Sequence, residues 1–415
     1  MNAFTYAFLA ALGLGTAIRL WLAYRHTHHV EMHRNSVPAS FADRVTLEAH
    51  QKAAGYTIAK TRLHVIEMLV GVSVLLLLTL GGGVQWLSGQ WSEWFAPGGY
   101  TYGIALIGSV FAVTGLIDLP FALYRTFVIE ARFGFNRITL RLFMADLCKQ
   151  LFIGAALGVP LLFVVLWLMN QMGSWWWLYV WFTWMGFNLL ILILFPTVIA
   201  PLFNKFSPLQ DESLRERIEQ LLEKCGFKTR GVFVMDGSKR SSHGNAYFTG
   251  LGTAKRIVFF DTLLSRLAPA EIEAVLAHEL GHFKRRHITK RIVLMFAVSL
   301  AFLAGLAYLA QQAWFYQGLG VQDQGTATAL LLFILVVPSF TFFAQPLGNS
   351  YSRKHEYEAD AYAAHQTGAA DLIQALVKLY QDNAATLTPD PLHSAFYDSH
   401  PPAGLRIARL QALAR

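Results

Sequence analysis

Charged residues are scarce in this sequence. Asp, Glu, Lys and Arg make up 14% of its 415 residues, while 54% are hydrophobic; a soluble globular protein has about 25% charged residues. This shortage excludes an ordinary soluble protein and indicates a chain that lies largely within a membrane. The formal net charge of +8 would also suit nucleic-acid binding. However, the basic residues follow the loops beside apolar runs, as in membrane proteins, so no nucleic-acid partner is expected.

Cysteine is almost absent as well. Cys148 and Cys225 are the only two and lie far apart, which excludes a disulfide framework and a cysteine-ligated metal and fits a reducing cytoplasmic face. The first apolar run has no positive charge before it and no small-residue cleavage site after it. We therefore expect it to be a retained membrane span and not a secretory signal.

What the sequence does contain is long apolar runs. A bilayer core of about 30 Å needs about 20 mostly apolar residues in a helix. Seven stretches meet this condition: 3–24, 65–88, 101–123, 151–172, 175–198, 291–313 and 327–346. The fourth and fifth are joined by residues 172–174 alone, so they are expected to form a tight helical hairpin.

The positions of Lys and Arg predict the orientation of these spans. Apart from Arg19 and Arg291, all of the 34 lie in the segments 25–62, 124–149, 199–290 and 347–415, and the loops 89–100, 173–174 and 314–326 contain none. Loops rich in Lys and Arg stay in the cytoplasm. The N-terminus is therefore expected outside and every large polar segment inside.

The spans divide the chain into four expected parts. Residues 1–198 contain helices one to five with their loops, 199–290 form a cytoplasmic domain, 291–346 contain helices six and seven, and 347–415 complete the domain. Within 199–290, the pattern predicts an amphipathic helix at 213–224, short strands at 232–235 and 257–260, and a helix from Pro269. The segment 347–415 is expected to be helical with a break at 401–402.

The helix that starts at Pro269 carries the sequence H-E-x-x-H at His278, Glu279 and His282. Residues four apart lie on one helix face, so both imidazoles can bind one ion. A catalytic zinc takes three protein ligands and leaves one position for water, whose proton Glu279 can accept. The motif predicts one zinc ion per chain; the alternative is a chance match of two structural histidines.

The third ligand has several candidates in the segment 352–360: His355, Glu356, Glu358 and Asp360. Glu356 and Asp360 are four residues apart on one face, so one can bind the metal while the other orients a ligand histidine. Glu358 points about 160° away from Glu356 and is expected to face solvent. The spacing also fits a solvated helix face and does not say which carboxylate binds.

Other polar residues lie in or beside the spans. A second metal site is one interpretation of His26, His28, His29 and His33, and polar anchoring at the membrane surface is the favoured one. Glu67 and Asp118 lie within spans two and three, where a carboxylate is costly and usually faces water or a partner. They are candidates for the lining of a polar chamber.

Segments in order over nearly the whole chain resemble the type I CAAX prenyl endopeptidases, the seven-span zinc proteases that process prenylated proteins. The segments are VTLEAHQKAAGYTIAK (45–60), FVIEARFGFNRIT (127–139), PLFNKFSPL (201–209), SSHGNAYFTG (241–250), LAHELGHF (276–283), SRKHEYEADAYA (352–363) and SHPPAGLR (399–406). The resemblance implies an all-α integral membrane protein whose seven helices surround a water-filled chamber. A mostly helical, zincin-like metalloprotease domain with short strands is implied on the cytoplasmic side.

The resemblance also implies roles for single residues. It makes Glu356 the third zinc ligand and places Asp360 beside the metal site, as an orienting or proton-donating group. Asn245 is implied as a substrate-positioning residue and His400 as a donor that stabilises the transition state. Arg406 is implied near the carboxylate of the substrate.

The expected function is that of a membrane-embedded zinc metalloendopeptidase. Its substrates are expected to be prenylated or other membrane-associated polypeptides, cleaved near the C-terminus with Glu279 as general base. The alternatives are a quality-control metalloprotease that needs no lipid and a non-catalytic transporter or scaffold. The final residues LQALAR lack a dibasic signal for retrieval to the endoplasmic reticulum, so a bacterial inner membrane is the expected location.

Overall fold

The structure is a computed structural model that describes residues 1–229, 231–249 and 256–413. Gly250, at the end of the segment 241–250, and Ala414 and Arg415, at the end of the chain, lie outside the described residues.

Seven helical segments are long and apolar enough to cross a membrane, which confirms the predicted number of spans. They are Ala3–His33, Leu47–Leu78, Tyr100–Glu130, Leu140–Gln171, Gly173–Phe203, His287–Leu309 and Thr326–Thr367. Most extend well beyond the apolar runs that predict them. The predicted end of the second span, residue 88, is wrong. The helix stops at Leu78, and the chain then turns at Gly82, with a φ of 78°, into a separate short helix.

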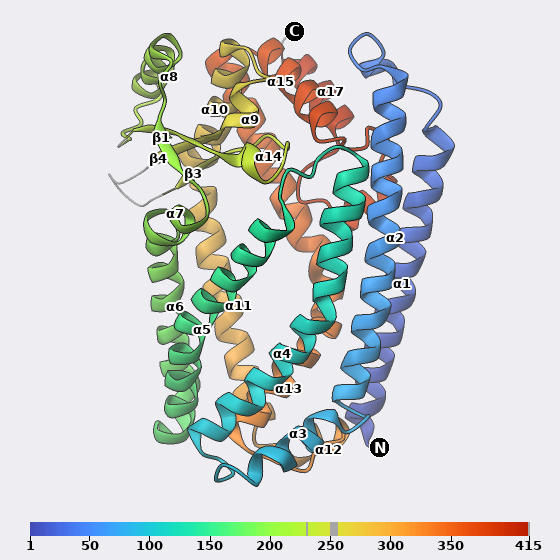
Figure 1. The fold of residues 1–415 in the computed structure, drawn as a ribbon, viewed down its shortest axis with the longest axis vertical. Helices are drawn as coiled ribbons and strands as arrows, with labels where there is room; N and C mark the ends of the chain where they lie inside the picture. Colours follow the sequence, from blue (N-terminus) through green and yellow to red (C-terminus); the bar gives the residue numbers. More distant parts are fainter. Residues whose placement is uncertain (230, 250–255, 414–415) are drawn as a thin grey trace.

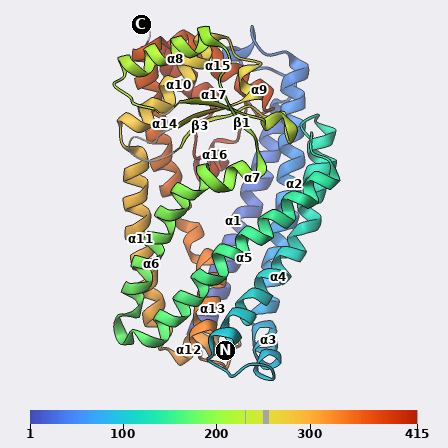
Figure 2. The ribbon, with the colours of Figure 1, turned by 60° about the vertical axis from the view of Figure 1, so that its left-hand side comes forward.

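The spans form a closed ring. In the order α1 (Ala3–His33), α2 (Leu47–Leu78), α4 (Tyr100–Tyr124), α5 (Leu140–Gln171), α6 (Trp176–Leu194), α11 (His287–Leu309) and α13 (Thr326–Thr341), each packs against the next, and α13 packs against α1. The expected hairpin of α5 and α6 is present, with its turn at Gly173–Trp175. Figures 1 and 2 show the ring from two sides.

The ring is hollow. A cavity of about 870 Å³ is lined by α4, α5, α6, α11 and α13 together, which is possible only on the inner side of the ring. A second cavity, of about 940 Å³, shares Phe111, Ala112, Gln150 and Leu151 with it. The interior space expected of a chamber is therefore present, and its filling with water stays a prediction.

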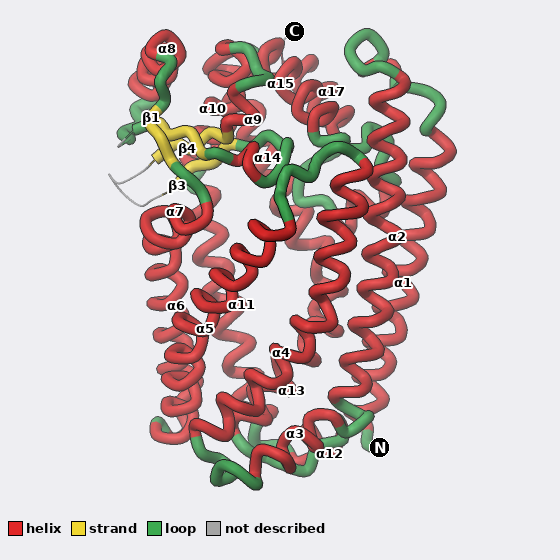
Figure 3. Tube along the Cα trace, viewed as in Figure 1, coloured by secondary structure: helices red, strands yellow, loops and turns green. Residues whose placement is uncertain are grey.

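The two ends of the ring differ. The N-terminus, α3 (Gly83–Ser92) and α12 (Ala313–Gly318) lie at one end, and a small sheet with the remaining helices lies at the other (Figures 1 and 3). These helices are α7 (Ala200–Phe203), α8 (Glu212–Lys224), α9 (Asp261–Leu264), α10 (Pro269–Lys284), α14 (Gln345–Thr367), α15 (Ala369–Asp382), α16 (Pro391–Tyr397) and α17 (Ala403–Leu413). The predicted helix at 213–224, the helix from Pro269 and the break at 401–402 are confirmed.

The sheet has the strand order β1-β2-β4-β3. Its strands are β1 (Phe206–Pro208), β2 (Val232–Met235), β3 (Ala246–Thr249) and β4 (Arg256–Phe260), and the pair β2–β4 is parallel while the other two pairs are antiparallel. Both predicted strands are present. β3 is an edge strand, so the backbone groups on its outer side have no partner strand within the described sheet.

One hydrophobic core unites the segments before and after the last two spans. Ile218 of α8 and Phe259 of β4 lie in the same buried cluster as Leu372 of α15 and Ile407 of α17. The two polar segments therefore fold as one unit at this end of the ring.

Candidate metal centre

The helix that carries the H-E-x-x-H sequence is well defined at its start. Pro269 occupies its first turn, where the missing backbone N–H costs no hydrogen bond. The Glu271 carboxylate accepts a hydrogen bond from the Ala268 backbone N–H at 2.7 Å. One face of α10, including Ile272 and Leu276, is buried in the shared core. The helix is thereby fixed with His278 and His282 facing α14.

Close packing of α10 on α14 brings these histidines to the acidic residues of the tail. Gly281 of α10 lies against Ala359 and Tyr362 of α14. Since Ala359 stands between Glu356 and Asp360 in the sequence, this contact carries both carboxylates to the motif.

Three side chains converge on one point. The Nε2 atoms of His278 and His282 are 3.2 Å apart. The Glu356 carboxylate lies 3.5 Å from the first through Oε2 and 3.4 Å from the second through Oε1. Among the described residues, these three form the one group of His, Cys, Asp and Glu side chains close enough to share a metal ion, with ligand atoms within 4.8 Å of one another.

These residues fit a divalent metal. Glu356 is 2% exposed, and its Oε2 is buried with no hydrogen-bond partner, although an unsatisfied carboxylate oxygen is costly in the interior. Two imidazole nitrogens and one carboxylate also match the ligands that a catalytic zinc prefers. A cation at this point would satisfy all three groups.

The Nδ1 side of the His278 ring contacts a buried ion pair between Asp360 and Arg406. Its Nδ1 lies 2.9 Å from Oδ1 of Asp360, and Arg406 donates hydrogen bonds to both oxygens of that carboxylate, at 2.8 and 2.6 Å. The Arg406 side chain is 7% exposed. The structure therefore places Arg406 on the far side of His278 from Glu356, in a buried position where its guanidinium is paired with Asp360; its expected contact with the carboxylate of a substrate stays a prediction.

His282 is supported by residues that the sequence reasoning missed. Its Nδ1 lies 3.0 Å from Nδ1 of His287, whose Nε2 lies 3.0 Å from Oε2 of Glu358. The expectation that Glu358 faces solvent is confirmed only in part, because its side chain is 30% exposed but also contacts His287 at the start of α11. One signal in the sequence was available: His287 is a polar residue at the very start of an apolar helix.

His400 and Asn245 are both exposed to solvent. The Nε2 of His400 is 3.5 Å from Oε1 of Glu356, and its side chain is 62% exposed, so it adjoins the cluster from the solvent side. Asn245 is exposed and directly precedes β3; its Oδ1 accepts from the backbone N–H of Ala246 at 2.8 Å, and its carbonyl oxygen accepts from that of Phe260 at 3.0 Å.

The pKa values of the motif residues diverge. Burial acts to lower the pKa of His278, but the neighbouring carboxylates of Asp360 and Glu356 raise it to about 9. Burial, assisted by the charge of His278, lowers the pKa of His282 to about 3. Burial also raises the pKa of Glu279. The protein without metal thus holds a proton on His278 and none on His282.

Of the four N-terminal histidines, His26 packs against the C-terminal segment. His26 stacks on His393 with ring centroids 3.9 Å apart, and its Nδ1 accepts a hydrogen bond from the backbone N–H of Asp390 at 3.3 Å. These contacts join α1 to the C-terminal segment, so the second metal site considered for His26 and its neighbours is not formed among the described residues.

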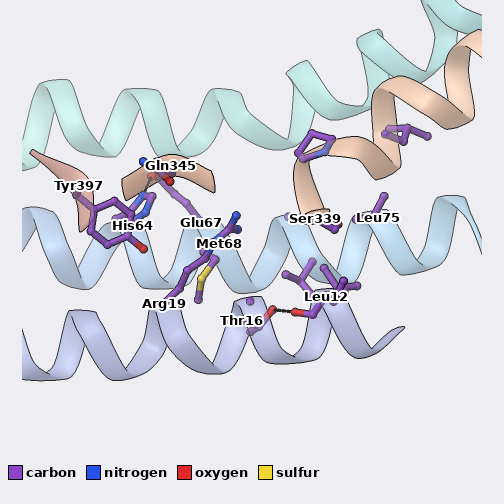
Figure 4. Close-up of a pocket in the computed structure, with 16 residues that line it drawn as sticks. Leu12, Thr16, Arg19, His64, Glu67, Met68, Leu75, Ser339, Gln345 and Tyr397 are labelled. Carbon is purple, nitrogen blue, oxygen red and sulfur yellow. Dashed lines mark hydrogen bonds and ion pairs between the residues drawn. The ribbon is translucent and has the colours of Figure 1, made fainter. Parts of the chain in front are cut away.

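The two intramembrane carboxylates face hollow parts of the ring. Glu67 forms an ion pair with Arg125 and lines a cavity of about 530 Å³ between α1, α2 and α13 (Figure 4). In this view Arg19, His64 and Tyr397 gather near Glu67. Asp118 lines the cavity of about 940 Å³. Both therefore line interior space, as expected.

Comparisons with known proteins agree with this architecture. Residues 26–205 match the family model for the CAAX prenyl protease N-terminal region with five membrane helices, and residues 208–414 match that for peptidase family M48. The chain is 32% identical to CAAX prenyl protease 1 homolog of Arabidopsis thaliana, over 91% of this chain and 90% of that protein. It is 31% identical to the Homo sapiens homolog, over 98% and 95% respectively. The crystal structure of S. mikatae Ste24p superposes with a TM-score of 0.92 at 29% identity, covering 99% of both chains.

Proposed function

Since this chain belongs to peptidase family M48 and is a membrane metalloendopeptidase, we propose that it cleaves peptide bonds near the C-terminus of prenylated or other membrane-associated polypeptides. The observation that carries the proposal is the convergence of His278, His282 and Glu356 on one point at the end of a hollow ring of membrane helices. The printed names of its relatives, CAAX prenyl protease 1, support the substrate class.

The proposed metal is one zinc ion per chain, held by Nε2 of His278, Nε2 of His282 and the carboxylate of Glu356. When bound, zinc would polarise the attacking water and the carbonyl group of the substrate. The pairing of two imidazoles with one carboxylate, and the unsatisfied Oε2 of Glu356, support this assignment.

The chain's own side chains would move the protons. Glu279 adjoins the ligand His278, and its raised pKa makes it a better base than an exposed carboxylate. It would accept the proton of the attacking water and then deliver it to the leaving amine. His400, exposed beside the cluster, would donate to the oxygen that becomes negative in the transition state.

The substrate backbone would add to the sheet. Within the described sheet the outer edge of β3 has no partner strand, so its N–H and C=O groups could pair with an extended peptide, and Asn245 just before this strand would anchor it. Asp360 and Arg406 act behind His278, so we propose that Arg406 positions Asp360 and does not bind the substrate.

The interior of the ring would hold the apolar part of the substrate. The cavity of about 870 Å³ is lined almost entirely by apolar side chains. It joins the cavity of about 940 Å³, which reaches Ser241 and His243, close in sequence to Asn245. A hydrocarbon chain could therefore lie against the apolar lining of this space, which leads toward β3.

The orientation and the domain division are proposals too. The Lys- and Arg-free loops gather with the N-terminus at one end of the ring (Figure 1), which supports an outside N-terminus and a cytoplasmic metal centre. We propose 199–290 and 347–415 as the two parts of the metalloprotease domain, joined through 291–346, on the basis of their shared core. The bacterial inner membrane stays a prediction.

A farnesylated C-terminal peptide and its unfarnesylated twin test the function. Mass spectrometry of the products should show cleavage of the farnesylated peptide by the purified protein. Equal cleavage of both peptides would favour the quality-control alternative, and cleavage of neither would refute the proposal. The transporter or scaffold alternative is set aside by the family assignment.

A further inference from the structure

We propose that His287 and Glu358 are positioning residues that select the metal-binding tautomer of His282. The inference rests on the proposed metal site but not on the choice of substrate. His287 contacts no ligand atom that faces the metal position; it acts through the far nitrogen of the His282 ring.

The side chains of His282, His287 and Glu358 form a chain of contacts that leads away from the metal position; this chain is called the relay below. Nε2 of His282 faces His278 and Glu356, while its Nδ1 lies 3.0 Å from Nδ1 of His287. The other nitrogen of His287 lies 3.0 Å from the Glu358 carboxylate. His287 is 1% exposed, so water does not compete for these bonds.

Only one arrangement of protons suits this relay when a metal is bound. A carboxylate accepts hydrogen bonds and does not donate them, so neutral His287 carries its proton on Nε2 and leaves Nδ1 bare. The bare Nδ1 accepts the N–H at Nδ1 of His282. Nε2 of His282 is then free of a proton and turned toward the metal. The opposite tautomer of His287 would put the proton of His282 on its metal-facing nitrogen.

The backbone is bent in a way that makes this contact. In an uninterrupted helix, a residue five positions after His282 would lie about 140° around the axis. Here Arg286 adopts a left-handed conformation, with a φ of 55°, which is uncommon for a residue with a Cβ. This turn follows the end of α10 and places His287 in contact with Nδ1 of His282.

The ring of His287 is also clamped from its other side. It stacks on His355 of α14 with centroids 3.9 Å apart and an interplanar angle of 9°. Since His355 directly precedes the proposed ligand Glu356, the stack ties the relay to the third ligand. The ring can neither tilt nor flip without disturbing α14.

Metal affinity is the direct test. His287→Phe keeps the stacked ring but removes both nitrogens, and it should weaken zinc binding by about tenfold to a hundredfold, measured against a chelator. His287→Gln restores a hydrogen-bond acceptor and should recover part of that loss. The visible spectrum of the Co²⁺-loaded protein should change in His287→Phe, because the His282 ring loses the contact at its Nδ1 that orients it.

Substitutions of Glu358 test the same inference independently. The Glu358 side chain is 30% exposed, so its replacement leaves the hydrophobic core intact. Glu358→Leu should weaken zinc binding about tenfold and Glu358→Gln less. Lys354→Leu, an exposed position one turn earlier on α14, is the matched control and should bind zinc as the parent does.

The outcomes separate this inference from the proposed function. Zinc affinity and a Co²⁺ spectrum equal to the parent's in both His287→Phe and Glu358→Leu would overturn it. If His287→Phe fails to fold, the Glu358 pair decides alone. Cleavage of neither test peptide by a parent protein that binds zinc would refute the substrate proposal and leave the relay standing.

Discussion

A Cβ atom placed on Gly281 would lie 2.9 Å from Cα of Ala359 and 3.1 Å from the Ala359 carbonyl oxygen. Both neighbours are backbone atoms, which cannot rotate away. The glycine inside the H-E-x-x-H sequence is therefore what lets α10 and α14 approach closely enough to bring the ligands together.

Gly281→Ala is expected to push the two helices apart. We expect zinc affinity to fall at least about tenfold and the free energy of unfolding to fall by about 1–3 kcal/mol, as for other overpacked sites. Chelator competition and thermal unfolding measure the two effects. Gly305→Ala, where a Cβ meets nothing within 4 Å, should be neutral, and an unaffected Gly281→Ala would show that α14 can shift without cost.

Glu279→Gln should separate metal binding from proteolysis. Zinc is expected to stay bound, while cleavage falls by about a hundredfold to ten-thousandfold, because the amide cannot accept the proton of water. His278→Ala should lose both. Atomic absorption beside the peptide assay gives both readouts, and retained cleavage in Glu279→Gln would remove Glu279 from the mechanism.

Arg406→Ala should leave the Asp360 carboxylate buried without its cation. Breaking such a pair costs about 3–5 kcal/mol, so we expect a large loss of stability and weaker zinc binding. The milder Arg406→Lys should lower zinc affinity while KM for the farnesylated peptide stays unchanged. A raised KM with normal zinc affinity would instead restore the substrate contact implied by the sequence.

Zinc affinity should increase with pH. The pKa of His278 in the metal-free protein is about 9, and only the neutral imidazole binds a metal, so binding releases a proton. Affinity should therefore rise up to about tenfold per unit between about pH 6 and pH 8. The stability of the metal-free fold should change with pH in the opposite direction. Because the pKa is raised above its ordinary 6.5, the stabilisation is present at low pH and is lost as pH rises through about 9. Chelator competition at several pH values would reveal a flat profile if His278 were neutral throughout.

Filling the apolar cavity should affect lipidated substrates alone. Gly158 of α5 lines this cavity, and a Cβ there meets nothing within 4 Å. Gly158→Leu should raise KM for the farnesylated peptide about tenfold and leave the unfarnesylated one unchanged. Leucine also favours the helix over glycine by about 1 kcal/mol. Gly186→Leu, on α6 and equally open but not lining that cavity, is the control. An equal effect on both peptides would place the lipid elsewhere.

The spans could be predicted because bilayer thickness acts directly on the length of apolar runs. The end of the second span was missed, although Gly81, Gly82 and Gly83 stand in a row; the backbone leaves the helical conformation at Thr79 and is left-handed at Gly82. Likewise, helix periodicity predicted that His278 and His282 lie close together, because both belong to one helix.

The remainder of the site depends on contacts between helices. Periodicity placed Glu358 on the opposite face from Glu356 but could not show that α11 covers this face with His287. The different surroundings of Glu356, which lies near Nε2 of His282, and of Asp360, which is paired with Arg406, arise from contacts between helices that periodicity does not reveal. Arg406 is basic and follows a proline-rich break, and nothing in such a pattern reveals that it is buried.

The shared core has a consequence for how the molecule matures. Two histidines of the centre precede the last pair of spans, and the carboxylate follows them, so a ribosome must finish both insertions before the ligand set exists. An isolated fragment 199–290 would lack Glu356 and expose the apolar surface that α15 and α17 cover. With His278, His282 and Glu356 as the proposed ligands, proteolytic activity can begin only after the tail has docked.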